Sequence, residues 1–405
     1  MFEVFGEARL PILQDKPFAQ SLSVEVGYRY SDYSLGFDTD TYKLGADWAP
    51  ADSIRFRTSF QRAVRAPNLQ ELFLAGRVQL NGTTDPCAGI IGDADPTDDP
   101  TATLAECANS GVTAAQYGNI LANPAAQYNG FLAGNPNLDP ESSDTVSFGF
   151  VFTPTFLDGF SVAADVFNIT VEDLIGQVGQ DLTLNQCLTT GSAEFCGLIN
   201  RLPTNGSLWL GSGGFIEDPI INTGSLETTG MDVEANYRLA LGETGGRLAF
   251  QLIGTYIDEL LIEPLSGSGV EYNCVGFHGP TCQTPTPEWR HKLRATYTTP
   301  WNMDLSLSWR YIDEVQIDLA STDPDLAGGF PGTEARLGAR SYMDLAAGYQ
   351  WNKMSFRLGI NNLFDKDPPI VGQAVCIGTY CNGNTYPQVY DTLGRYVFAG
   401  LTADF

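Results

Sequence analysis

Hydrophobic and polar residues alternate along most of this chain, most clearly from Trp289 to Tyr311. In the first half of this stretch Trp289, Leu293 and Tyr297 alternate with charged residues, and a second alternating run follows Pro300. A period of two residues is typical of β-strands, because successive side chains point to opposite faces. Both runs are about ten residues long, end in aromatics and join through a short turn, as in a transmembrane β-barrel hairpin.

The same alternation predicts about thirteen strands along the chain. The first is expected near residues 4–10, before a turn in the sequence LPILQDKPF. The others are expected near residues 22–30, 42–48, 54–60, 146–152, 160–171, 231–237, 248–256, 289–297, 303–311, 343–351, 356–360 and 395–405. An odd number is unusual for a bacterial barrel of one chain. We therefore expect further strands before the N-terminus of this sequence.

The predicted connections alternate strictly between short and long, and the longest spans about residues 62–142. Outer-membrane barrels combine short periplasmic turns with long extracellular loops, whereas a soluble barrel or propeller has no reason to separate loops by length. The pattern predicts an all-β fold, a transmembrane antiparallel β-barrel. Residues 1–405 are expected to form one barrel domain whose last strand ends on the periplasmic side.

Composition agrees with a barrel in a membrane. The 43 glycines, 23 phenylalanines, 17 tyrosines and six tryptophans suit turns, strands and interfacial girdles. No run of 18 apolar residues occurs, and the mean hydropathy is −0.10, as expected where only alternate residues face lipid. The first residues contain no signal peptide, so we expect the sequence to be incomplete.

Charge and motifs exclude several classes of function. With 22 basic and 48 acidic residues the net charge is −26, which argues against nucleic acid as a partner. The two histidines, His278 and His291, belong to no motif for catalysis or zinc, so we expect neither an enzyme nor a cofactor. The acidic segment 93–100 lacks EF-hand spacing and is interpreted as a solvated loop. Three Asn-x-Ser/Thr sequons, at Asn81, Asn168 and Asn205, are interpreted as chance.

Eight cysteines lie in pairs, and each pair falls in its own long loop. An even number without any CxxC motif favours local disulfides in an oxidising compartment over zinc or free thiols. Eight cysteines permit 105 connectivities. Because neighbours share a loop, we predict the pairs Cys87–Cys107, Cys187–Cys196, Cys274–Cys282 and Cys376–Cys381.

Four stretches resemble landmarks of the TonB-dependent outer-membrane receptors. They are RAPNLQELF at 65–73, NPNLDPESSDTVSFGF at 135–150, NNLFD at 361–365 and GRYVFAGLTADF at 394–405, although Val64 stands where the family has an aromatic. The resemblance spans essentially the whole chain. It implies a 22-stranded barrel closed by an N-terminal plug, of which this chain resembles the last thirteen strands. We therefore expect neither the plug nor the segment that contacts TonB within residues 1–405.

The alternation places charged residues on the polar face of the strands. A charge facing lipid at the membrane midplane costs about 2–4 kcal/mol, so this face should line the lumen. Its members are expected either to grip the plug or line the ligand route, or to form salt bridges without a specific role. The candidates are Arg55, Arg57, Arg290, Lys292, Arg294, Arg310, Asp232, Glu234 and Asp344.

Aromatic residues fall into two groups. Those near strand ends are interpreted as the interfacial girdle: Tyr28, Tyr30, Trp48, Phe60, Trp289, Trp309, Tyr311 and Trp351. Those in long loops are candidates for contact with a ligand, because loops often carry binding residues. These candidates are Tyr117, Tyr128, Phe131 and Trp209.

The resemblance implies active, TonB-dependent uptake of a scarce nutrient across the bacterial outer membrane. Iron-siderophore, cobalamin and oligosaccharide are all compatible ligands. The expected partners are outer-membrane lipid, the plug, TonB and the nutrient, and the protein is expected to act as a monomer. Two alternatives remain: an adhesin or phage-receptor type of interaction protein, and a passive porin.

Overall fold

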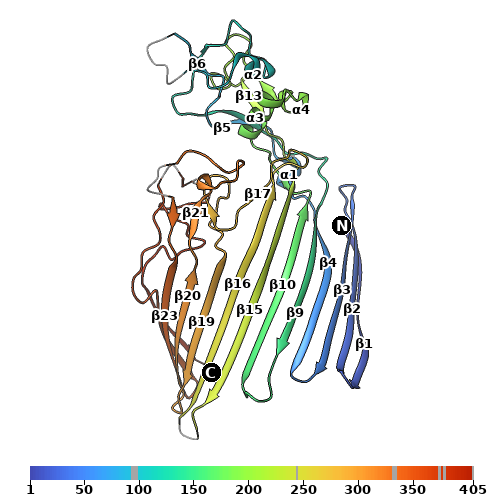
Figure 1. Cartoon of the computed structure of the whole chain (residues 1–405), viewed down its shortest axis with the longest axis vertical. Helices are drawn as coiled ribbons and strands as arrows, with labels where there is room; N and C mark the ends of the chain where they lie inside the picture. Colours follow the sequence, from blue (N-terminus) through green and yellow to red (C-terminus); the bar gives the residue numbers. More distant parts are fainter. Residues whose placement is uncertain (93–98, 243–244, 331–334, 373–374, 377–379, 404–405) are drawn as a thin grey trace.

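The computed structural model describes residues 1–405 except 93–98, 243–244, 331–334, 373–374, 377–379 and 404–405. Thirteen long strands pair with their neighbours along the chain in one antiparallel sheet (Figure 1). They are β1 (Phe2–Lys16), β2 (Ala19–Asp32), β3 (Asp38–Ala51), β4 (Ile54–Arg65), β9 (Glu141–Phe152), β10 (Phe160–Glu172), β15 (Ser225–Ala240), β16 (Arg247–Glu263), β19 (Trp289–Thr298), β20 (Met303–Ile312), β23 (Arg340–Trp351), β24 (Met354–Asn361) and β25 (Tyr396–Ala403). The all-β prediction and the thirteen strands are confirmed. The sheet is open, since β1 and β25 lie at its two edges.

Connections of different length gather at opposite ends of the sheet. At one end, called the short-turn end, strands join through residues 17–18, 52–53, 153–159, 241–246, 299–302 and 352–353. At the other, the long-loop end, they join through residues 33–37, 66–140, 173–224, 264–288, 313–339 and 362–395. The prediction of strictly alternating lengths is wrong at 33–37, a five-residue connection at the long-loop end.

Several strands are longer than the alternation predicts. The first strand continues to Lys16 through an irregularity between Pro11 and Leu13, so the predicted turn shrinks to residues 17–18. A proline can be accommodated there because β1 is an edge strand and the irregularity relieves its missing donor. At the long-loop end β4 and β9 pair as far as Arg65 and Glu141, which shortens the predicted loop 62–142 to 66–140.

The strand register gives the sheet one apolar face and one charged face. On the apolar face aromatic rings pack across strands, as Trp48 does on Phe56 and Phe56 on Phe148. Near the long-loop end the same face becomes polar, where Arg62 pairs with Asp144 through contacts of 2.7 and 2.5 Å. Alternation of apolar and polar residues therefore does not predict the ends of β4 and β9 there, although their backbone hydrogen bonds continue as far as Arg65 and Glu141.

At the long-loop end His291 lies among three of the residues interpreted as girdle. It accepts a hydrogen bond from the Trp289 indole N–H at 2.7 Å and packs against the rings of Trp309 and Tyr311. These four side chains belong to β19 and β20, on the apolar face. They form an aromatic cluster at one edge of the lipid-facing band that the sequence predicts.

The long connections fold into two units with cores of their own. The first, called the head unit, consists of residues 66–140 and 173–224 and stands beyond the ends of β9, β10, β15 and β16 (Figure 1). Its elements are α1 (Leu69–Phe73), β5 (Arg77–Gly82), β6 (Gly89–Ile90), α2 (Leu104–Asn109), β7 (Asn119–Ile120), β8 (Tyr128–Leu132), β11 (Ile175–Gly176), α3 (Gln180–Thr190), α4 (Ala193–Cys196), β12 (Ile199–Asn200), β13 (Phe215–Glu217) and β14 (Ile221–Asn222).

The second, called the C-terminal loop unit, consists of residues 264–288, 313–339 and 362–395. Its elements are β17 (Tyr272–Asn273), β18 (Phe277–His278), β21 (Val315–Ile317), the 3₁₀ helix η2 (Asp318–Ala320) and β22 (Arg336–Leu337). Parallel pairing of β18 with β21 joins two of its three connections. Within the described parts of the chain, none of the helices is long and apolar enough to cross a membrane.

Four disulfides cross-link these two units internally, two in each. The bonds are Cys87–Cys107 and Cys187–Cys196 in the head unit, and Cys274–Cys282 and Cys376–Cys381 in the C-terminal loop unit. All eight cysteines are paired as predicted. The acidic segment interpreted as a solvated loop falls mostly on residues 93–98, outside the described residues.

Candidate functional site

The charged face of the sheet carries all nine residues predicted to face the lumen. The ladders place Arg57, Asp232 and Arg290 in one row across the strands, and Lys292 opposite Arg310 on the next strand. Contact with a plug or ligand stays a prediction for each of them. The structure does, however, divide the nine into paired and unpaired charges.

Several charges on the N-terminal half of the sheet are paired with one another. Arg55 donates to Asp47 at 3.0 Å, and Lys43 donates to Glu25 at 3.0 Å. Arg57 reaches past β9 to Asp165 on β10, with a contact of 2.6 Å from Nε. These pairs surround an open cavity of about 760 Å³ on this face.

The Arg57–Asp165 pair depends on Gly149, which lies between the two residues on β9. Both Arg57 and Asp165 take Gly149 as their ladder partner. A Cβ at this position would overlap the Asp165 carboxylate. The missing side chain therefore lets an ion pair join strands that are not adjacent.

Arg310 is the centre of a second charged group. Its guanidinium contacts Asp344 on β23 at 2.8 and 2.9 Å, and Asp391 in the last connection at 2.9 Å. The guanidinium also lies over the Tyr342 ring, 5.1 Å from its centroid. These contacts hold the last connection against the charged face, beside a cavity of about 570 Å³ that Lys292 also lines.

Arg65 and Glu141 join the head unit to the sheet. The Arg65 guanidinium contacts Glu141 at 2.5 and 2.6 Å, and Glu71 of α1 at 3.1 Å. Glu71 and Asn68 also form a capping box at the start of α1. Glu141 also accepts from the Ile175 backbone N–H at 2.7 Å, so its carboxylate ties the second segment of the head unit to the ends of β4 and β9, between which the first segment runs.

A buried ion pair joins the two segments inside the head unit. Arg201 donates to both carboxylate oxygens of Asp85, at 2.7 and 3.0 Å, and to Ser110 and the Gly206 carbonyl. The two side chains are only 4% and 7% exposed. Removing one partner of such a pair leaves an uncompensated buried charge, which typically costs about 3–5 kcal/mol.

The four aromatic candidates for ligand contact all lie in the head unit, but they differ in accessibility. Tyr128 is buried in its core and donates to Asp181 at 2.5 Å. Burial and the neighbouring Asp181 raise the pKa of Tyr128 far above its usual range. A ligand could reach this ring only if the core opened.

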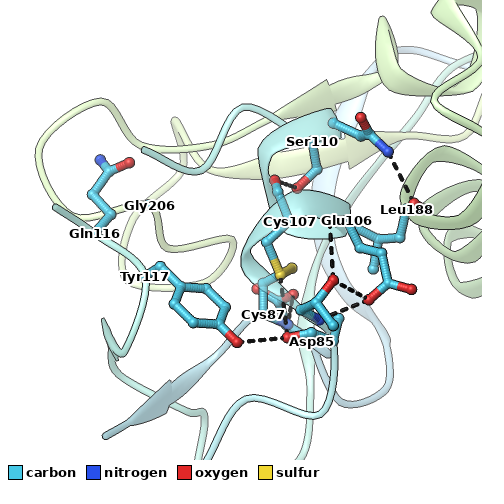
Figure 2. The surroundings of a disulfide bond; sticks show 12 residues. Asp85, Cys87, Glu106, Cys107, Ser110, Gln116, Tyr117, Leu188 and Gly206 are labelled. Atoms are coloured by element: carbon cyan, nitrogen blue, oxygen red, sulfur yellow. Dashed lines mark hydrogen bonds between the residues drawn. A yellow bond between two sulfur atoms is a disulfide. The ribbon is translucent and has the colours of Figure 1, made fainter. Parts of the chain in front are cut away.

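The other three aromatics are partly buried. Figure 2 shows Tyr117 beside the Cys87–Cys107 disulfide, where its hydroxyl donates to the Ala102 carbonyl at 2.9 Å. The Trp209 indole donates to the Leu121 carbonyl at 2.9 Å, and Phe131 packs against Phe215. Each therefore supports the fold of the head unit, and contact with a ligand stays a prediction.

Burial shifts the pKa of one further titratable group in each loop unit, Asp218 in the head unit and His278 in the C-terminal loop unit. Asp218 accepts from the Gly179 N–H at 3.1 Å and from Gln177 at 3.0 Å, and burial raises its pKa to about 6. In the C-terminal loop unit His278 lies 3.2 Å from the Tyr386 hydroxyl, and burial lowers the pKa of His278 to about 4. Within the described residues, no group of three or more His, Cys, Asp or Glu side chains is arranged to hold a metal ion.

Asp165, Glu141, Asp85 and Arg201 were not predicted from the sequence as partners in these ion pairs. Glu141 and Arg65 did carry a signal, since both lie in stretches that resemble family landmarks and flank the longest connection. Asp85 and Arg201 carried none. They are 116 residues apart in sequence, and only the folding of the head unit brings them together.

The family model described as TonB dependent receptor-like, beta-barrel matches residues 2–363. No curated protein sequence matches the chain. Among solved structures, a mutant of the ferric enterobactin receptor PfeA from Pseudomonas aeruginosa, in complex with enterobactin, superposes with a TM-score of 0.60 at 16% identity. The siderophore receptor PirA from Acinetobacter baumannii superposes with a TM-score of 0.59, also at 16% identity. Both superpositions cover 100% of this chain but only 45% of the other chain.

Proposed function

Because this chain belongs to the TonB-dependent receptor β-barrel family, we propose that it forms part of a receptor for active uptake of a scarce nutrient. Proteins of this family are outer-membrane transport receptors. We infer the outer membrane as the location of this chain as well. Residues 1–405 act there as one part of a barrel domain, with the charged face toward the lumen and the long-loop end outside the cell.

The observation that carries this proposal is the family match over residues 2–363, on a sheet with one apolar and one charged face. Lipid favours the apolar face, and water or protein in the lumen favours the charged face. Four disulfides at the long-loop end suit an oxidising, extracellular environment. At the short-turn end the connections are too short to form a comparable surface.

The proposed mechanism has two steps. The head unit and the C-terminal loop unit capture the nutrient outside the cell, and energy delivered through TonB then rearranges a plug inside the barrel. One of the similar structures is a ferric enterobactin receptor in complex with enterobactin and another is a siderophore receptor, so iron-siderophore is one candidate class beside cobalamin and oligosaccharide. The whole family mechanism is proposed for the receptor of which this chain is a part.

Uptake measurements test this proposal. The gene would be deleted in its host, and growth would be compared under limitation of iron, cobalamin or oligosaccharide carbon, with and without a functional TonB. We expect the deletion to abolish growth on one nutrient, and loss of TonB to have the same effect. Uptake that continues without TonB would contradict the proposal and favour a passive porin. Unimpaired growth on every nutrient would favour the adhesin or phage-receptor alternative.

A further inference from the structure

The small sheet of the head unit ends in a strand that has a neighbour on one side only. Its strands follow the order β12, β13, β8 and β5, so β5 lies at an edge and, within the described residues, pairs with β8 alone (Figure 1). The pairing is regular from Arg77 to Leu80 and becomes irregular before Gly82. Residues 77–80 are called the open edge. Alternate residues of an edge strand direct their N–H and C=O groups away from the sheet, where a further strand can pair with them.

One face of this sheet is apolar and accessible beside the open edge. Val78 and Leu80 lie on that face and are 37% and 53% exposed. Val78 lies opposite Phe131 of β8, whose ring packs against Phe215 of β13 with 5.5 Å between the ring centroids. The opposite face, to which Gly130 belongs, packs against α3. A strand added at the open edge would therefore extend the apolar face if its own apolar residues alternated.

The charge of the head unit selects among possible partners. Residues 66–140 and 173–224 contain 13 acidic and two basic residues, so their net charge is −11. Arg201 is buried with Asp85, whereas Arg77, on the open edge, is exposed. Like Arg290 of β19, Arg77 forms no ion pair among the described residues. A complementary partner is positively charged as a whole and places one carboxylate opposite Arg77.

The same charges argue against a second copy of this chain as the partner. Two head units with a net charge of −11 each would repel one another. Antiparallel pairing of two copies of β5 about Gln79 would match Val78 with Leu80, but it would place Asn81 opposite Arg77. No carboxylate would then neutralise Arg77. A different protein fits the open edge better.

We propose that the open edge is a docking site for an extended segment of a different, basic protein, which adds a strand to the sheet of the head unit. The segment carries apolar residues opposite Val78 and Leu80 and one Asp or Glu opposite Arg77. Backbone hydrogen bonds supply much of the affinity, and the side chains supply the specificity. This interaction is separate from nutrient uptake, and it rests on the proposed function only for placing the head unit outside the cell.

Peptide binding to the purified 405-residue chain in detergent micelles, measured by fluorescence anisotropy, tests the site. The probe is the peptide Lys-Lys-Thr-Val-Thr-Val-Glu-Lys-Lys, which matches the open edge in antiparallel register. The control, Lys-Lys-Thr-Thr-Val-Val-Glu-Lys-Lys, has the same composition without the alternation. We expect the probe to bind about tenfold more tightly than the control, with an affinity that falls between about 50 and 200 mM salt. Equal binding of the two peptides, or no binding of either, would overturn the proposal.

Two N-methylated probes distinguish strand addition from apolar contact alone. Methylation of a peptide nitrogen removes one hydrogen-bond donor, and only alternate nitrogens of an added strand face its neighbour. The methyl group is placed on the central threonine in one peptide and on the following valine in the other. We expect one of the two to bind about tenfold more weakly and the other to bind like the probe. Equal losses in both peptides would contradict strand addition.

Two matched double variants locate the site on the head unit. Val78→Thr with Leu80→Thr removes the apolar side chains beside the open edge and keeps residues that favour strands. Leu104→Thr with Leu121→Thr removes two leucines of similar exposure, 41% and 51%, elsewhere in the same unit. We expect the first variant to bind the probe about tenfold more weakly and the second to bind it like the wild type. Equal binding by the two variants would overturn the proposal.

Arg77→Gln tests the carboxylate that the partner should carry. We expect this variant to bind the probe about threefold more weakly, as for the loss of an exposed ion pair. A probe with Gln in place of Glu should bind the variant and the wild type equally, because the interaction is then absent from both. Equal losses for the two probes would contradict the pairing of Arg77 with a carboxylate.

Light scattering in the same detergent checks for the other occupant. We expect a single copy of the chain per micelle. A dimer that Val78→Thr with Leu80→Thr abolishes would assign the open edge to a second copy and overturn the proposal. None of these measurements involves uptake, so the docking site can fail while the transport function stands, and the reverse.

Discussion

Asp218 and Arg201 are both buried in the head unit, but among the described residues only Arg201 has a partner of opposite charge. Arg201 is compensated by Asp85, Ser110 and a backbone carbonyl. Asp218 has hydrogen-bond donors, from Gly179 and Gln177, but no cation among its described contacts. Burial therefore acts on Asp218 without an opposing charge, and its protonated form is favoured.

The pKa of Asp218 predicts a pH dependence of the head unit. Its folded-state pKa of about 6 exceeds the ordinary value of 3.8. The stability it contributes is fully present below the ordinary value and is lost as the pH rises through about 6. We expect the melting temperature of the head unit to be higher at pH 5 than at pH 7.5, as measured by scanning calorimetry. In Asp218→Asn this difference should shrink, and a full-sized difference in that variant would contradict the assignment.

At the scale of a strand, β9 contributes to the packing on both faces of the sheet through two successive residues, Phe148 and Gly149. Its Phe148 packs against Phe56 on the apolar face, while Gly149 leaves room on the opposite face for the Arg57–Asp165 pair. A larger residue would have to displace the carboxylate or the nearby Ala164 carbonyl. Position 149 of β9 therefore requires glycine, because the Arg57–Asp165 ion pair passes over it.

Gly149→Ala should destabilise the sheet by about 1–3 kcal/mol, because the new methyl group overlaps Asp165 and breaks its pair with Arg57. The measurement is urea unfolding in detergent micelles. Gly348→Ala is a suitable control, since Gly348 lies on the charged face of the sheet, in β23, and the nearest neighbour of the new methyl group, the Phe356 carbonyl, would be 4.0 Å away. Equal effects of the two substitutions would show that loss of glycine itself, and not the overlap, is responsible.

At the scale of the molecule, the long connections are two folded bodies on one sheet. The core of the head unit contains Cys87, Tyr128, Leu184 and Ile216, which come from both of its segments. The core of the C-terminal loop unit contains Val315, Val371 and Tyr386, from two of its three segments, and His278 adds the third. Units with separate cores can open separately.

Removal of one disulfide should therefore affect only one unit. We expect Cys187→Ser with Cys196→Ser to destabilise the head unit by about 3 kcal/mol, the value for a loop of this length. Limited proteolysis should then cut residues 66–140 and 173–224 faster than in the wild type. Cleavage within residues 264–288, 313–339 and 362–395 should stay unchanged. Faster cleavage in both units would show that they unfold together.

The sequence by itself determined the features that depend on local periodicity. Alternation is set by the strand backbone, so it predicted thirteen strands and the charged face, and it separated short from long connections everywhere except at residues 33–37. Local spacing was also sufficient for the four disulfides, because each pair is at most 20 residues apart. At the long-loop end the same alternation ended too early, since both faces of β4 and β9 are polar there.

Only the tertiary structure decided which charges are neutralised. Arg57 and Arg290 look alike in the sequence, each an arginine at an alternate position of a strand. Their difference depends on the residue that lies in the same row on the adjacent strand, Gly149 for Arg57 and Thr255 for Arg290. Such contacts join strands far apart in the chain, and their energy depends on distances of a few ångströms that periodicity does not specify.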